Sequence, residues 1–244
     1  MKLVERRLLR GPNIHSPRPC LLAVIDLEGL DDVSSASPDG FTDRLLALLP
    51  TLQKHRCSPG YVGGFVERLR AGTYMAHIVE HVTLELQCLA GPAVGFGKAR
   101  MVRDRPRHYR VVVAYRSESV AQRAIEVALA LVERLATGEA FALEPVLIEL
   151  RSLAARAAIG PSTRAIVDAA EQRGIPITRL TESANLFQLG WGALQQRVQA
   201  TITSQTNHVA VSIASDKELT KKLLAEAGLR VPRGQTVSSI EAAH

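Results

Sequence analysis

The apolar positions of the chain recur with two periods, and each period predicts one kind of secondary structure. Three apolar segments that end in turn-forming residues are expected to be strands: 2–10, 21–27 and 109–115. Four segments whose apolar side chains recur every three to four residues are expected to be helices: 41–49, 65–70, 73–89 and 120–136. This order of strands and helices predicts an α/β or α+β sandwich for residues 1–160.

The helix at 73–89 has recognisable boundaries. Thr73 is expected to cap its start, and Gly91-Pro92 to end it, because proline has no backbone donor with which to continue a helix. The stretch before it, residues 55–64 (HRCSPGYVGG), is too rich in glycine and proline to be regular structure throughout. Residues 29–40 are expected to be a loop for the same reason.

The second half of the chain begins a different pattern. A helix at 142–158 ends at Gly160-Pro161, where we expect a domain boundary. Beyond it, helices and strands are predicted in four segments: 163–173, 175–180, 195–200 and 216–227. Residues 161–244 are therefore expected to form a unit distinct from residues 1–160.

Composition permits a packed core and favours acidic partners. Hydrophobic residues make up 46% of the 244 residues, and the formal net charge is +6. Five arginines fall within eleven residues: Arg100, Arg103, Arg105, Arg107 and Arg110. They form either a solvated basic loop or a groove for a polymer with exposed carboxylates. No nucleic-acid motif accompanies them, so nucleic acid is not an expected partner.

Cysteine usage and the chain start favour a cytoplasmic protein. Cys20, Cys57 and Cys88 have no short-range pairing pattern that would indicate a disulfide framework. The opening residues are charged and lack the apolar run of a secretory signal. No apolar stretch is long enough to cross a bilayer, so no membrane association is expected.

The candidate chemistry lies in the predicted helix 73–89. His77 and His81 are four residues apart, so they share one helical face and can point two imidazole nitrogens at one metal ion. Glu80 lies beside them, where it can take a proton from a metal-bound water. This His-x-x-Glu-His spacing is that of the inverted zincins.

A zinc hydrolase needs a third protein ligand, and two residues are candidates. Cys57 lies in the irregular stretch before the helix, and it is our preferred third ligand. Glu85 lies two turns from His77, and if Cys57 is the ligand, Glu85 is better interpreted as a residue that orients His81. A histidine pair of this kind can equally be a polar helix face, a structural site or a site that no longer binds metal.

Several long segments together resemble the amino-terminal region of cyanophycin synthetase. In the first half these are RGPNIHS, HRCSPG, GGFVERLRAGTYMAHIVEHVTLELQCLAG and VGFGKAR. In the second half GPSTRAIVDAAEQRGIP, FQLGWGALQQRVQATIT and SDKELTKKLLAEAGLRVPRG resemble the segment where that family enters its ATP-grasp domain. The resemblance covers nearly the whole chain.

The resemblance implies a nitrogen-storage ligase that polymerises aspartate and arginine into cyanophycin, using ATP and Mg²⁺. It implies that residues 1–160 bind the polymer and, with zinc, cut it to make primers, and that residues 161–244 begin the ATP-grasp domain. The sites for ATP and Mg²⁺ are not expected within this chain, which ends at His244. A homo-oligomer is implied for the full-length enzyme. The alternative is a non-catalytic polymer-binding module with an idle histidine pair.

Overall fold

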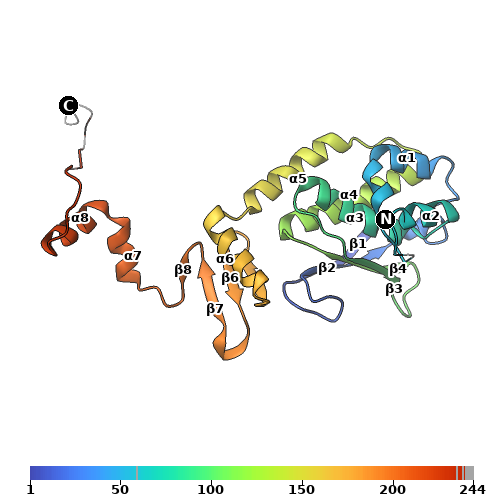
Figure 1. Cartoon of the computed structure of the whole chain (residues 1–244). Helices are drawn as coiled ribbons and strands as arrows, with labels where there is room; N and C mark the ends of the chain where they lie inside the picture. Colours follow the sequence, from blue (N-terminus) through green and yellow to red (C-terminus); the bar gives the residue numbers. More distant parts are fainter. Residues whose placement is uncertain (59, 235, 238, 240–244) are drawn as a thin grey trace.

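The computed structural model describes residues 1–58, 60–234, 236–237 and 239, and it has a mixed α+β architecture (Figure 1). Four strands form the first sheet: β1 (Lys2–Leu9), β2 (Cys20–Asp26), β3 (Gly97–Met101) and β4 (His108–Ala114). They pair antiparallel in the order β1-β2-β4-β3. The predicted fold class of mixed helices and sheet is thereby confirmed.

Five helices accompany this sheet: α1 (Phe41–Leu48), α2 (Gly64–Ala71), α3 (Met75–Ala90), α4 (Glu118–Ala136) and α5 (Leu143–Ala157). Helices α3 and α4 pack against each other and against strands of the sheet. In β2 the alternate residues Leu21, Ala23 and Ile25 enter the core, as period-two side chains on one face of a strand do. They meet Val111 and Val113 of β4.

Helix α3 is the central element of this core. Every residue from Met75 to Gln87 is buried, including the ionisable His77, Glu80 and His81. Buried ionisable groups are costly unless they are paired, neutral or bound to metal, so their presence makes this helix the place of the candidate functional site.

The second part of the described chain contains α6 (Pro161–Gln172) and a four-stranded antiparallel sheet in the order β5-β6-β7-β8. Its strands are β5 (Ile177–Thr181), β6 (Leu186–Leu189), β7 (Gln196–Gln199) and β8 (Ile202–Thr203). Helices α7 (His208–Ser215) and α8 (Lys217–Glu226) follow, and Figure 1 shows them standing apart from both sheets. Of the predicted unit 161–244, residues 235, 238 and 240–244 lie outside the described residues.

Some elements differ from the sequence-based prediction. Strand β3 was not predicted, because Ala99 is its only buried residue and the rest of GKARM carries no apolar alternation. Strands β6 and β8 and helix α7 were also missed, since they are short. The segment 100–110, expected to be a loop or groove, is instead largely a β3–β4 hairpin, in which Arg100 and Arg110 pair across the strands.

Candidate metal centre

Helix α3 places His77 and His81 one turn apart and begins two residues later than predicted. It starts at Met75 with Tyr74 as its N-cap residue, so the prediction that Thr73 caps it is wrong. The Thr73 hydroxyl instead lies 2.9 Å from Nδ1 of His77. Thr73 is a residue type that often caps helices, but here its hydroxyl contacts the imidazole ring of His77.

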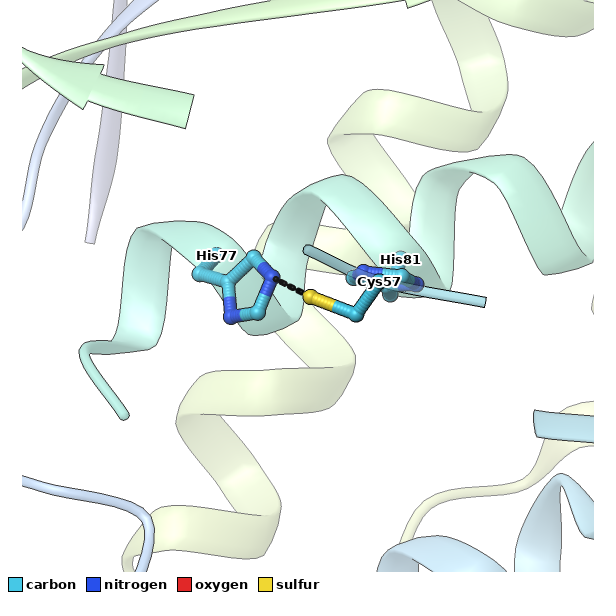
Figure 2. A group of neighbouring side chains, drawn as sticks. All are labelled: Cys57, His77 and His81. Carbon is cyan, nitrogen blue, oxygen red and sulfur yellow. Dashed lines mark hydrogen bonds between the residues drawn. The ribbon is translucent and has the colours of Figure 1, made fainter. Parts of the chain in front are cut away.

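Cys57 reaches the same place from the irregular segment between the 3-10 helix Pro50–Lys54 and α2. Its Sγ lies 3.2 Å from Nε2 of His77, and Figure 2 shows the thiol lying between His77 and His81. Ligand atoms of Cys57, His77 and His81 all lie within 4.8 Å of one another. Within the part of the chain that the structure describes, this is the group of three that could hold a metal ion.

The surroundings keep both imidazoles neutral. Burial, with a smaller effect of the Arg68 charge, lowers the pKa of His77 to about 4. Burial, with the neighbouring His77, His55 and Arg68, lowers the pKa of His81 to about 2. A neutral imidazole keeps a lone pair, which is the form that binds a metal. Two nitrogens and one sulfur are also a donor set that suits Zn²⁺, so these residues fit the ion.

Glu80 lies on the flank of α3 that faces strand β3. Burial raises the pKa of its carboxyl to about 8, although the Ala99 backbone N–H and Arg68 favour the ionised form. The carboxylate fits closely against Gly97, where an added Cβ would overlap it. Glu80 is not among the three grouped ligands, and its raised pKa suits a group that accepts and returns a proton near neutral pH.

Glu85, the alternative third ligand, has other partners. Its carboxylate accepts hydrogen bonds from Thr51 and from Nε2 of His55, the latter at 2.7 Å. Nδ1 of His55 lies 3.0 Å from Nδ1 of His81. Sequence reasoning missed His55, although it precedes Cys57 by two residues in the same HRC segment.

The predicted polymer-binding arginines occupy the β3–β4 hairpin. Arg103 and Arg105 are exposed in its turn, and Arg100 is exposed on β3. Arg107 donates a hydrogen bond to Asp26 at 3.2 Å, so part of its charge is offset. The hairpin therefore presents positive charge to the surroundings, mainly through Arg100, Arg103 and Arg105.

Comparisons with known proteins show which sequences this chain is similar to. Residues 22–137, which include most of β2, strands β3 and β4 and helices α1 to α4, match the family described as cyanophycin synthase-like N-terminal domain. This segment matches the model of that family, and the chain as a whole is similar to the cyanophycin synthetases. The resemblance inferred from the sequence motifs is thereby confirmed.

The relatives are similar to this chain along almost all of its length. It is 46% identical over 242 residues to cyanophycin synthetase from Synechocystis sp. (strain ATCC 27184 / PCC 6803 / Kazusa), which is 97% of this chain and 28% of the relative. It is 44% identical over 246 residues to the enzyme from Crocosphaera subtropica (strain ATCC 51142 / BH68), again 28% of the relative. The chain thus spans little more than a quarter of these relatives.

Among the described residues, no helix has both the length and the apolar character needed to cross a bilayer.

Proposed function

We propose that this chain acts as part of a cyanophycin synthetase, which joins aspartate and arginine into cyanophycin with ATP. The proposal is supported by the sequence identity between this chain and proteins of that name, which is 46% and 44% along almost the whole chain. Residues 161–244 would begin the ATP-grasp domain, and residues 1–160 would be the amino-terminal domain. ATP and Mg²⁺ would bind the full-length, cytoplasmic and oligomeric enzyme, and no residue of this chain is assigned to them.

The amino-terminal domain would have two tasks of its own. The exposed arginines of the β3–β4 hairpin would bind the carboxylates of the polymer. Cys57, His77 and His81 would hold zinc, and the site would hydrolyse the polymer to produce primers. The observation that carries this second task is the convergence of one thiol and two neutral imidazoles within 4.8 Å of one another.

The chemistry can be assigned to named groups. Zinc, when bound, would act as a Lewis acid that lowers the pKa of water and polarises a peptide carbonyl. Glu80 would accept the proton of the attacking water as its oxygen bonds to the carbonyl carbon. Glu80 would then pass that proton to the nitrogen of the leaving amine as the C–N bond breaks. Phe65, whose ring stacks on that of His81 at 3.8 Å, would keep one side of the site dry.

The alternative is a binding module that holds polymer without cutting it. The exposed charge on the hairpin favours this function independently of the metal site. The two proposals differ in one respect, which is whether zinc-loaded protein breaks peptide bonds in cyanophycin.

The test is to incubate the zinc-loaded chain with cyanophycin and measure newly formed chain ends. Glu80→Gln should retain zinc and lose activity by roughly 10²–10⁴-fold, because a general base has been removed. Zinc-loaded wild-type protein that binds polymer and leaves it intact would support the binding module and exclude the peptidase. Cleavage that persists in Glu80→Gln would exclude Glu80 as the base.

A further inference from the structure

Three side chains form a continuous hydrogen-bonded row behind His81. His55 lies next to His81, with its Nδ1 at 3.0 Å from His81 Nδ1 and its Nε2 at 2.7 Å from the Glu85 carboxylate. Thr51 donates a further hydrogen bond to that carboxylate. Neither the His-x-x-Glu-His spacing nor the zinc ligand set accounts for His55.

The charge of Glu85 determines the direction of the hydrogen bonds that its carboxylate makes with His55 and Thr51. Burial disfavours its charge, but hydrogen bonds from His55 and Thr51 outweigh burial and lower the pKa of the carboxyl. An ionised carboxylate can only accept, so Nε2 of His55 carries the proton. When the His55 imidazole is neutral, its other nitrogen is a bare acceptor, and Nδ1 of His55 can accept a hydrogen bond from Nδ1–H of His81 across the 3.0 Å between them.

We propose that His55 is a positioning residue that holds His81 in the Nδ1–H tautomer and thereby turns the Nε2 lone pair toward the metal. This inference rests on the metal site of the proposed function, because it concerns how one ligand of that site is prepared. It assigns a role to a residue that touches neither the ion nor the substrate.

The other histidine of the site is held in the same manner. The Thr73 hydroxyl engages Nδ1 of His77, and Nε2 of His77 is the atom that lies 3.2 Å from Cys57 Sγ. Both imidazoles thus have Nδ1 occupied by a protein partner and Nε2 available. Support of this kind behind a metal ligand fixes the ring and typically changes metal affinity by about 10- to 100-fold.

The chain connectivity strengthens the argument. His55 and Cys57 belong to one short irregular segment, so the segment that supplies the sulfur ligand also supplies the support for His81. His55 is only partly buried, and its polar contacts with His81 and Glu85 use both ring nitrogens. A residue retained only to fill space would not require two nitrogens at these positions.

The experiment compares His55→Leu with His55→Asn in the full chain. Leucine removes the acceptor, whereas the asparagine side-chain oxygen can take the place of Nδ1 and accept from His81. His15→Leu is the matched control, because His15 lies in a loop remote from α3 in the sequence and outside this network. Two quantities are measured: the ¹⁵N shifts of the His81 ring in metal-free protein, and the Kd for zinc by chelator competition.

The proposal predicts an Nδ1–H tautomer of His81 in the wild type and in His55→Asn. In His55→Leu the tautomers should mix, and zinc should bind about 10- to 100-fold more weakly, with His15→Leu unchanged. An Nε2–H tautomer of His81 in the wild type would overturn the proposal even if the leucine variant failed to fold. An unchanged tautomer and unchanged Kd in a folded His55→Leu would also overturn it. A wild type that binds no zinc would refute the metal site separately, since the tautomer is measured without metal.

Discussion

At the residue scale, Glu80 shows how burial determines the chemistry of one side chain. Its spacing from His77 and His81 could be predicted, because positions on one helix follow from the sequence alone. Its raised pKa and its contact with Gly97 could not, because both depend on the packing of β3 against α3. The contacts of His55 with His81 and Glu85 could not be predicted either, since they depend on the path of an irregular segment.

Glu80→Gln should stabilise the metal-free protein increasingly as the pH rises. The folded-state pKa of Glu80 is about 8, above its ordinary 4.5, so folded protein binds a proton that unfolded protein lacks between these values. Wild-type stability therefore falls as pH rises through this window, and the variant escapes that loss. Thermal melts with chelator measure the free energy of unfolding of both proteins at pH 5 and pH 8.5. Relative to wild type, the free energy of unfolding of the variant should rise by roughly 1–3 kcal/mol between these two pH values. A difference that does not change with pH would contradict the buried carboxyl.

Gly97→Ala should impair catalysis while leaving zinc bound. An added Cβ would overlap the Glu80 carboxylate, so Glu80 must move from its position against β3. We expect the rate of cyanophycin cleavage to fall by at least about 10-fold, because a misplaced catalytic group no longer reaches the reacting atoms. Gly95→Ala is the matched control, because an added Cβ there meets nothing within 4 Å. Equal activity of the two variants would contradict the assigned role of Glu80.

At the element scale, the β3–β4 hairpin carries a cluster of exposed arginines. The clustering of arginines was visible in the sequence, but their presentation on a hairpin was not. Strand β3 has one buried residue, so its pairing with β4 is imposed by the sheet rather than by its own pattern. Helices α3 and α4 were predictable because their apolar positions recur over many turns.

Replacing Arg103 and Arg105 together by Gln should weaken polymer binding by about 2- to 30-fold, the range expected for two exposed charge contacts. Binding should also become less sensitive to salt, because fewer charges are involved. Arg173→Gln with Arg230→Gln is the control, since both arginines are exposed in the second part of the chain. Sedimentation of cyanophycin with each protein at two salt concentrations measures the effect. Equal losses in both pairs would mean that net charge, and not the hairpin, governs binding.

At the scale of the whole molecule, the two parts of the chain differ in how much they bury. Almost all of the large buried side chains lie before Gly160, whereas α7 and α8 have no buried residues. Among the contacts between the parts, the Glu182 carboxylate accepts hydrogen bonds from the backbone N–H groups of Glu118 and Ser119. The boundary at residue 160 was predicted from Gly160-Pro161 and stays a prediction.

Hydrogen exchange should reveal this difference directly. Backbone amides of α3 should be protected by the core, whereas those of α7 and α8 should exchange at least about 100-fold faster, because exposed elements open at little cost. Mass spectrometry of peptides from the three helices provides the comparison, with α4 as a second protected reference. Similar protection in α3 and α8 would show that the second part is as stable as the first.

The most direct test of the account is the zinc content of the purified chain, measured beside His77→Ala and Glu80→Gln. The account predicts one equivalent in the wild type and in Glu80→Gln, and loss of zinc in His77→Ala, because one of the three ligands is removed. Absence of zinc from the wild type after incubation with the metal would contradict the metal centre. The same would follow if His77→Ala bound zinc as tightly as the wild type.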